Sequence, residues 1–431
     1  MATTDRPAPP HVERIFDIDP GRSSRLTLPN GVTLWVCGDC PQEDVVRLDM
    51  MLRGGRWHQR HLLQAGYTNR MLQEGTRRHT AREVAEAFDY HGAWTDFSCS
   101  MLHSYATLYC MGRHFGSMAA LLHEVVSEPA FDADELHLQA AIGRQNQRVT
   151  LSRPPFRAKA MLASMLFGPE HPAAAYATDA DYDRLSPAML RDFYNRHYNT
   201  ANTTLLLSGN ITDDVIAAVT DLFGRTVTES DPTPVRGLHR DTQPADDMVR
   251  KMPMPDAAQA SLRMGMTVPG MDSPDYLLLH ILTTVYGGYF GSRLMQNIRE
   301  QKGYTYGISA GLTAYPDASV LSIASDVNAG HIDDTIAEVR NEMERLCDTP
   351  VGDDELEMVR NYMMGELMRS FDGPFYASDA RIYLLELGLP DDFYARSVEA
   401  LRTVTAHDLR EVARRYYDPG KLRVAIAGKI A

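Results

Sequence analysis

The sequence predicts an α+β protein built from two homologous domains in tandem, and three observations lead to this prediction. The chain has 431 residues, which is too long for one hydrophobic core. Its second half repeats the first half at an offset of 219 or 220 positions. Each half also mixes strand-like and helix-like patterns without the strict alternation that is typical of a doubly wound parallel sheet.

The internal repeat is clearest at the end of each half. The segment from Leu185, LSPAMLRDFYNRHYNTANTTLLLSGNI, aligns with the segment from Val404, VTAHDLREVARRYYDPGKLRVAIAGKI. The same offset of 219 brings Pro155-Phe156 onto Pro374-Phe375, and an offset of 220 brings Asp134-Glu135-Leu136 onto Asp354-Glu355-Leu356. A period this long indicates a duplicated domain rather than a solenoid repeat.

The elements of the first half can be predicted in chain order. Residues 26–36 read as strand, turn, strand, with Asn30-Gly31 as the hairpin turn. Residues 45–52 read as another strand, and residues 81–90, 115–126 and 134–150 read as amphipathic helices. In each copy of the repeat a helix begins after a capping hydroxyl, Ser186 or Thr405, and a short apolar strand follows it.

A polar, proline-containing stretch separates the two copies. We therefore predict an N-terminal domain over residues 1–228, a linker over 229–247 and a C-terminal homologous domain over 248–431.

Composition limits the kinds of partner and the compartment. The net charge of −14 argues against nucleic-acid binding, and a cleft with this charge would attract basic peptides. No 18 apolar residues run together, and the polar N-terminus has no apolar core of signal-peptide length. The five cysteines are few and scattered, as suits a reducing compartment. We expect a cytoplasmic protein that does not bind a membrane.

Several motifs give the chain a family resemblance. The segment from Ser292 to Tyr306 reads SRLMQNIREQKGYTY, and the first half carries Phe167-Gly168-Pro169-Glu170-His171-Pro172 and Phe193-Tyr194-Asn195-Arg196-His197-Tyr198. With the two-fold repeat, these motifs resemble the pitrilysin/insulinase (inverzincin) metallopeptidases, particularly the branch that includes the mitochondrial processing peptidases. The resemblance implies that each domain is a mostly antiparallel sheet flanked by helices.

The same resemblance implies a zinc site that this chain does not complete. Active members carry HxxEH on one helix, in which two histidines bind zinc and the glutamate is the general base, and a glutamate from a later helix is the third ligand. Counting back from Gly75-Thr76, the motif falls on residues 66–70, with Gly66, Asn69 and Arg70 at the three functional positions.

The third ligand of the family falls near Gln145 and Asn146. Glycine has no side chain, asparagine cannot accept a proton as a base, and arginine is a permanent cation. Because neither Gln145 nor Asn146 is acidic, we expect no zinc or other cofactor in this chain.

The substrate-binding motif of the family is present in the second half. Arg299 and Tyr306 match an Arg/Tyr pair that, in the family, binds substrate and stabilises the oxyanion. Two simpler interpretations remain open for these residues. Arg299 could be a surface arginine paired with Glu300 or Glu342, and Tyr306 could be a packing residue of an apolar strand.

Loss of the metal half with retention of the Arg/Tyr pair predicts a non-catalytic, substrate-binding subunit. It would form a heterodimer with an HxxEH-bearing homologue that holds zinc, and the peptide substrate would be cleaved in the partner's site. An alternative is a structural or peptide-binding scaffold with no role in proteolysis. A third hypothesis, an active peptidase with a rearranged metal site, lacks ligands to support it.

Overall fold

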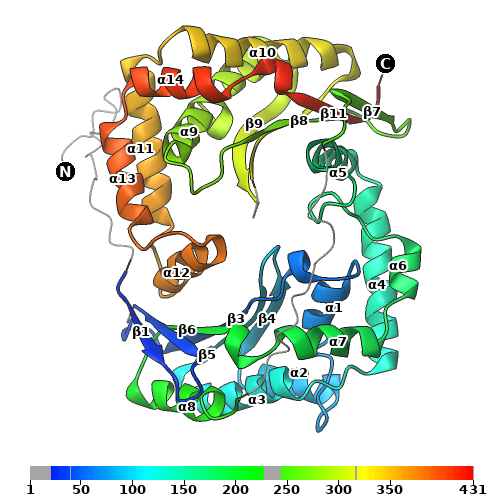
Figure 1. Ribbon diagram of the computed structural model, residues 1–431, viewed down its shortest axis with the longest axis vertical. Helices are drawn as coiled ribbons and strands as arrows, with labels where there is room; N and C mark the ends of the chain where they lie inside the picture. Colours follow the sequence, from blue (N-terminus) through cyan, green and yellow to red (C-terminus); the bar gives the residue numbers. More distant parts are fainter. Residues whose placement is uncertain (1–20, 39, 228–243, 316–317, 431) are drawn as a thin grey trace, which may run out of the picture.

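The computed structural model describes residues 21–38, 40–227, 244–315 and 318–430. The described residues form two α/β layers stacked along the long axis of the molecule, with one sheet in each half (Figure 1). The sequence-predicted linker, 229–247, lies almost entirely outside the described residues, so the domain boundaries at 228 and 248 stay predictions.

The first half contains six strands and eight α-helices among the described residues. Its strands are β1 (Ser23–Thr27), β2 (Thr33–Cys37), β3 (Val45–Leu52), β4 (Trp94–Cys99), β5 (Ser104–Met111) and β6 (Thr203–Gly209). Its helices are α1 (Gln64–Arg70), α2 (Ala81–Tyr90), α3 (Phe115–Ser127), α4 (Ala133–Leu151), α5 (Pro154–Phe167), α6 (Asp179–Asp183), α7 (Pro187–His197) and α8 (Asp213–Phe223).

The second half contains five strands and six α-helices among the described residues. Its strands are β7 (Val249–Pro253), β8 (Ala260–Val268), β9 (Thr305–Ala314), β10 (Ser319–Val327) and β11 (Arg423–Gly428). Its helices are α9 (Tyr276–Thr283), α10 (Ile332–Asp348), α11 (Asp353–Arg369), α12 (Tyr376–Leu387), α13 (Phe393–Thr403) and α14 (Ala406–Tyr416). Two π-helical segments, η4 (Thr284–Gly288) and η5 (Met295–Gln301), lie between α9 and β9.

The two sheets share one topology. The first has the order β1-β2-β6-β3-β5-β4, and the second has the order β7-β11-β8-β10-β9. From β2 and β7 onward the strands correspond one to one, and in both sheets only the pair formed by the repeated strand (β2 with β6, β7 with β11) is parallel. The predicted fold class, two homologous domains with mostly antiparallel sheets, is confirmed.

The predicted caps and strands lie where the sequence places them. Ser186 caps α7 by accepting a hydrogen bond from the Met189 amide, and Thr405 caps α14 in a capping box with Asp408. The predicted hairpin is β1–β2, the predicted strand 45–52 is β3, and the helix predicted over 81–90 is α2. These elements form because their signals are local: a side chain that satisfies a free helix amide, a turn dipeptide, and a regular apolar period.

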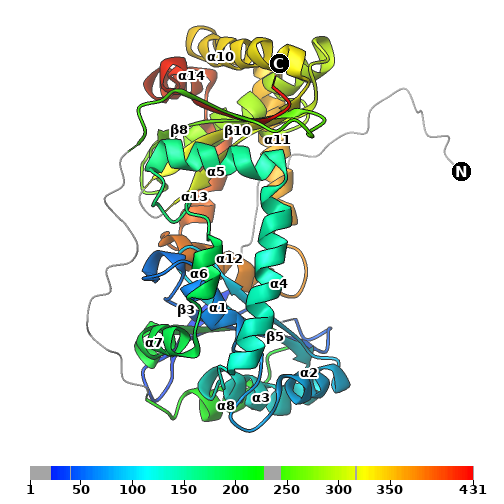
Figure 2. The same cartoon turned by 90° about the vertical axis from the view of Figure 1, so that its right-hand side faces the viewer.

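The two halves exchange one helix each. Helix α5 comes from the first half but packs on the second sheet, where Met161, Leu162 and Met165 are buried together with Val320 and Ala425. Gly265 of β8 permits this approach, because a Cβ there would lie 3.2 Å from Leu162 Cδ2. Helices α4 and α5 therefore connect the halves along one side of the molecule (Figures 1 and 2).

Helix α12 makes the reciprocal exchange on the other side. Its Ala377 is buried with Cys37, Met51 and Leu206 on the first sheet (Figure 1). By the repeat offset, α5 and α12 are the same helix of the duplicated unit. The two sheets are consequently joined by two apolar contacts related by the duplication, and neither half buries its sheet with its own residues alone.

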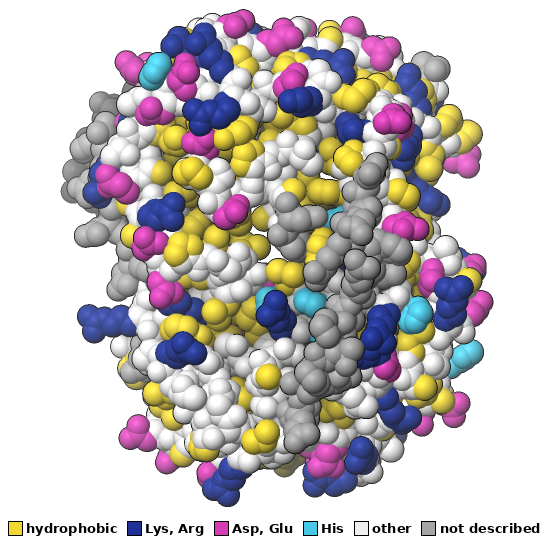
Figure 3. Space-filling model, viewed as in Figure 1, with side chains coloured by type: hydrophobic (Ala, Val, Ile, Leu, Met, Phe, Trp, Pro, Cys, Tyr) yellow, Lys and Arg dark blue, Asp and Glu magenta, His cyan; other side chains and the backbone are white. Residues whose placement is uncertain are grey.

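The surface is mixed in character. Hydrophobic side chains gather on the face between the two halves, whereas charged side chains of both signs are scattered around the outside (Figure 3). Across the described ranges, no helix combines the length and apolar character that a membrane span requires.

Candidate functional site

Helix α1 carries the residues at the predicted zinc-motif positions. It is a seven-residue helix wedged against β4, β5 and α7, and Gln64, Ala65, Tyr67, Thr68 and Asn69 are buried in these contacts. Gly66 and Arg70 are four residues apart and share the remaining, partly open face. A Cβ at Gly66 would meet no atom within 4 Å. The open face of α1 therefore carries Gly66 and Arg70, the two positions predicted from the sequence for the histidines of the zinc motif.

Asn69 stands at the position of the general base but is used to hold the fold. Its side chain is completely buried. The Nδ2 group donates to the backbone oxygens of Ser98 at 2.8 Å and Tyr105 at 2.9 Å, and Oδ1 accepts from the Tyr198 hydroxyl at 2.8 Å. Both N–H bonds of the amide and its oxygen thus join α1 to β4, β5 and the end of α7.

The electrostatic setting of α1 is cationic. Arg70 is half-buried, and its charge lowers the pKa values of Glu74 and Tyr67, although burial is the larger effect and raises both, that of Tyr67 to about 12. A guanidinium at this point opposes a divalent cation at the neighbouring Gly66 position.

Helix α4 has no acidic side chain at the predicted position of the third ligand. Gln145 and Asn146, the predicted third position, are exposed. The next residue, Gln147, turns inward instead: its Oε1 accepts from the Tyr182 hydroxyl at 2.7 Å and its Nε2 donates to Ala177 O. Gln147 was not among the residues predicted from the sequence, and the helical spacing from Gly143, which faces Tyr67, could have found it.

The donor set at these positions does not fit zinc. It offers a glycine, a buried amide, a guanidinium and glutamines, whereas zinc is bound by imidazole, thiolate or carboxylate. Among the residues that the structure describes, no group of three or more His, Cys, Asp or Glu side chains is placed to hold a metal ion.

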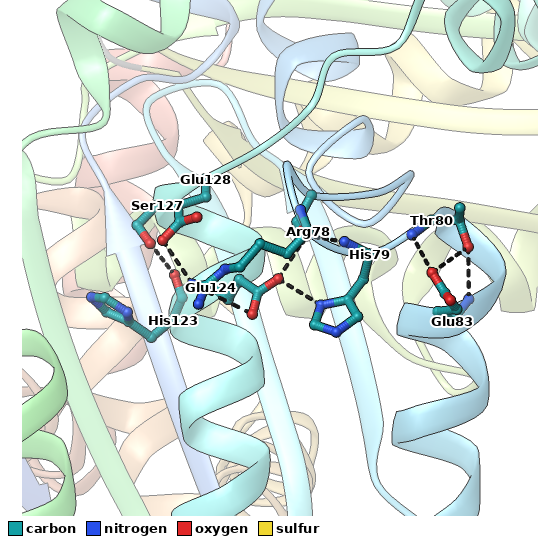
Figure 4. Close-up of polar contacts among 9 residues, drawn as sticks. Arg78, His79, Thr80, Glu83, His123, Glu124, Ser127 and Glu128 are labelled. Atoms are coloured by element: carbon teal, nitrogen blue, oxygen red, sulfur yellow. Dashed lines mark hydrogen bonds and ion pairs between the residues drawn. The ribbon is translucent and has the colours of Figure 1, made fainter.

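A polar cluster fixes the segment that follows α1. Glu124 of α3 accepts hydrogen bonds from Thr76 at 2.6 Å and from His79 Nδ1 at 2.8 Å (Figure 4). Arg78 donates to Glu128 at 2.7 Å, and Thr80 and Glu83 form the capping box of α2. Burial raises the pKa of Glu124, but its hydrogen bonds outweigh this effect and the net pKa is lowered. Because every member holds backbone or a neighbouring side chain, this cluster is structural.

A second cluster contains Ser100, His103 and Glu386, the residue types of a nucleophilic triad. Its geometry differs from a triad, because the Ser100 hydroxyl and the His103 imidazole both bind Glu386, at 2.5 Å and 2.8 Å, and among the described contacts the Ser100 hydroxyl bonds the backbone of His103 and not its ring. Tyr105 donates to the same carboxylate. The cluster links α12 of the second half to the first sheet. Its role is therefore to stabilise the packing of the exchanged helix, and it is not a catalytic triad.

Arg299 and Tyr306 lie together at the start of β9. The Nε of Arg299 donates to the backbone oxygen of Tyr306 at 3.0 Å, and its guanidinium lies over the ring of Phe290 at 4.6 Å. The Tyr306 side chain is 93% exposed. Phe290 was not among the residues predicted from the sequence; its place beside the Gly287-Gly288 pair was the available signal.

The surroundings of Arg299 and Tyr306 differ from those expected for a surface arginine paired with Glu300 or Glu342 and for a packing tyrosine. Glu342 is buried and binds Asn297 and Arg345, not Arg299. The Arg299–Glu300 pair is long, at 3.7 Å. Tyr306 cannot be a packing residue, because almost all of its side chain is exposed. Among the contacts of the described residues, no hydrogen bond or ion pair joins Arg299 or Tyr306 to the residues of α1.

Comparison with known proteins gives a consistent set of matches. Residues 184–363 match the family model described as "Peptidase M16 inactive domain". The chain is similar to the uncharacterized zinc protease YmxG of Bacillus subtilis, with 23% identity over 353 residues that cover 81% of this chain and 84% of that protein. It is also similar to the uncharacterized zinc protease Rv2782c of Mycobacterium tuberculosis, with 23% identity over 362 residues, 81% of this chain and 80% of that protein.

Solved structures share the fold. A peptidase M16 inactive domain from Pseudomonas fluorescens superposes with a TM-score of 0.80 at 20% identity, covering 95% of this chain and 98% of that one. A protease from Helicobacter pylori superposes with a TM-score of 0.83 at 14% identity, covering 94% of this chain and 99% of that one.

Proposed function

Because the chain belongs to the M16 (pitrilysin) peptidase family as a non-catalytic member, we propose that it is the substrate-binding subunit of a heterodimeric zinc peptidase. Its partner is a homologue that carries HxxEH and holds the zinc ion. This chain supplies Arg299 and Tyr306 to the partner's active site, where a peptide is cleaved.

The proposal rests on the exposure of the Tyr306 side chain and on the fixed position of the Arg299 guanidinium. A tyrosine that is 93% exposed gains almost nothing for the stability of its own chain. It lies beside an arginine whose position is fixed by a backbone oxygen and an aromatic ring. A fixed guanidinium and a free phenol are donors suited to a peptide carbonyl that becomes negative during attack.

The residues of α1 support the proposal that the zinc ion and the general base come from a second subunit. Gly66, Asn69 and Arg70 provide neither zinc ligands nor a base, and Asn69 is committed to three structural hydrogen bonds. Hydrolysis by this chain therefore depends on a second subunit for the metal and the base. What this chain contributes is the binding and orientation of the peptide and stabilisation of charge on its carbonyl oxygen.

The test compares the isolated chain, an HxxEH-bearing homologue and their mixture for zinc content and for hydrolysis of a fluorogenic peptide. We expect less than one-tenth of an equivalent of zinc and no chelator-sensitive hydrolysis from the chain alone, and hydrolysis from the mixture above that of the homologue alone. Stoichiometric zinc together with activity in the isolated chain would overturn the proposal.

A further inference from the structure

A cavity of about 670 Å³ lies in the second half, away from both groups of residues described above. Its walls come from α9, η4, the middle of β9, α11, α12 and α13. Neither Arg299 nor Tyr306 lines it. Its volume falls in the range of about 300–1,000 Å³ that ligand-binding pockets occupy.

Aromatic rings form much of the cavity wall. They are contributed by α9, α11, α12, α13 and the loop after α11, and they are Tyr276, Tyr362, Phe371, Tyr383, Phe393 and Tyr394. Tyr383 is 41% exposed, and its ring lies 6.2 Å from Phe393 and 6.4 Å from Tyr394. Rings at these separations are in contact with one another, and together they present an aromatic surface on which a further aromatic side chain can stack.

The permanently charged side chains that line the cavity are all acidic. Glu366 and Asp379 line it, and none of its lining side chains is a lysine or an arginine. His280 also lines it, and burial lowers the pKa of this histidine, so its ring is neutral at pH 7. Asp379 is already paired with the buried Arg47 at 2.6 Å. Glu366 is the carboxylate left to meet a ligand cation.

Glu366 is held only by a surface contact. Arg369, one helical turn further along α11, reaches it at 2.5 Å, but the arginine side chain is 74% exposed. Exposed pairs of this kind contribute little to stability, so an incoming cation can displace Arg369 at small cost.

One feature of the sheet indicates a peptide as the occupant. Strand β9 is the last strand of its sheet and pairs with β10 alone. Ala310, Gly311 and Leu312 of this edge strand line the cavity. An edge strand has backbone groups that can pair with an extended chain, whereas a free aromatic amine could not use them.

We propose that this cavity binds a peptide segment that carries an aromatic side chain next to a basic one. The aromatic ring lies among the rings of α12 and α13, and the basic group lies at Glu366. This site goes beyond the proposed function, because it requires neither the zinc-bearing partner nor Arg299 and Tyr306, and it is measured as binding by the isolated chain.

The experiment measures the fluorescence anisotropy of dye-labelled Gly-Phe-Arg-Gly and Gly-Phe-Gln-Gly with the isolated full-length chain. We expect the arginine peptide to bind at least tenfold more tightly than the glutamine peptide. Glu366→Gln should remove this preference, and Arg369→Gln should strengthen binding of the arginine peptide several-fold. Glu399→Gln is the matched control, because Glu399 forms the same kind of exposed pair with Arg402, three residues on, outside the cavity.

A blocking variant tests the location of the site. Gly311 lines the cavity, and a Cβ there would meet no atom within 4 Å; a Cβ is equally open at Gly307, which does not line the cavity. Gly311→Trp should abolish binding of both peptides, whereas Gly307→Trp should leave it unchanged. Equal affinity for the two peptides, a preference that survives Glu366→Gln, or unchanged binding by Gly311→Trp would overturn the proposal. Glu366→Gln alters an exposed pair, so its result stands even where a glycine variant does not fold.

Discussion

Arg299 and Tyr306 are seven residues apart in the sequence and are joined by a hydrogen bond of 3.0 Å from the arginine Nε to the tyrosine backbone oxygen. The turn between η5 and β9 brings them together, and Gly303 adopts a φ of 68° within it, a conformation that favours glycine. Phe290 supports the guanidinium from one side. The arrangement fixes the arginine through its inner nitrogen and leaves the phenol of Tyr306 exposed.

The first prediction concerns Tyr306→Phe, which removes only the hydroxyl group. Because the side chain is 93% exposed, we expect the free energy of unfolding to change by less than about 0.5 kcal/mol. In the reconstituted complex, loss of one donor to the reacting carbonyl should lower kcat by about tenfold or more. Urea unfolding and steady-state hydrolysis measure the two effects. A fall in stability with unchanged kcat would mean that the hydroxyl serves the fold.

The second prediction compares two neighbours on α1. Asn69→Asp replaces the two donors to Ser98 O and Tyr105 O by a buried carboxylate, and we expect it to cost about 2–4 kcal/mol of unfolding free energy. Gly66→Ala is the matched control, because its Cβ meets no atom and alanine favours a helix interior, which should stabilise the chain by about 0.5–1 kcal/mol. Urea midpoints measure both. Equal stability of wild type and Asn69→Asp would contradict the structural role assigned to Asn69.

The third prediction is a pH dependence at the contact of α12 with the first sheet. Burial raises the pKa of Glu386, but hydrogen bonds from His103, Ser100 and Tyr105 outweigh this, and the net pKa is lowered. A carboxyl group with a lowered folded pKa contributes stability above its unfolded pKa of about 4.3, and this contribution is lost as pH falls through the lower folded value.

Urea midpoints between about pH 3 and pH 7 measure this dependence. Wild type should lose more stability below about pH 4.3 than Glu386→Gln does. Burial raises the pKa of Asp49 nearby, which acts in the opposite direction, but Asp49 is present in both proteins and its effect cancels in the comparison. Parallel pH profiles for the two proteins would show that Glu386 does not carry the effect.

The fourth prediction concerns the exchanged helix α5. Leu162 is buried against the second sheet, so Leu162→Ala should cost about 2–5 kcal/mol. Leu138 of α4 is 54% exposed, and Leu138→Ala should cost less than about 1 kcal/mol. Because α5 belongs to one half by sequence and to the other by packing, we expect the described halves to unfold together in one transition. Two separate transitions, with only the first half affected by Leu162→Ala, would contradict the exchange.

The sequence predicted those parts of the fold that depend on local signals and on the repeat. Strand 45–52 and helix 81–90 have the predicted bounds, because an apolar run and a capped amphipathic period specify them without reference to the rest of the chain. The equal order of the two sheets follows from the duplication. By contrast, the exchange of α5 and α12 was not predicted, because an apolar helix face shows that it is buried but not against which sheet.

For the candidate site, the sequence indicated which side chains are present but not which contacts they make. The side-chain chemistry at Gly66, Asn69 and Arg70 could be assessed from the sequence, but the three hydrogen bonds of Asn69 connect it to residues at least 29 positions away. The inward-facing Gln147 was not predicted, because its contacts with Tyr182 and Ala177 depend on how α4 packs against residues 30 or more positions away. The cavity beside α11 has no motif, because its lining comes from segments that lie far apart in the sequence.

The measurement that tests the central claim most directly is the rate of peptide hydrolysis by the reconstituted heterodimer that contains Arg299→Ala, compared with the complex of the wild-type chain. We predict that the variant complex assembles with unchanged affinity and zinc content, and that kcat falls by about 10²–10³ because a fixed donor to the reacting carbonyl is lost. Arg82→Ala, which removes an arginine side chain that is 85% exposed, should leave kcat unchanged. An intact Arg299→Ala complex with the wild-type kcat would contradict the account and favour a scaffold role.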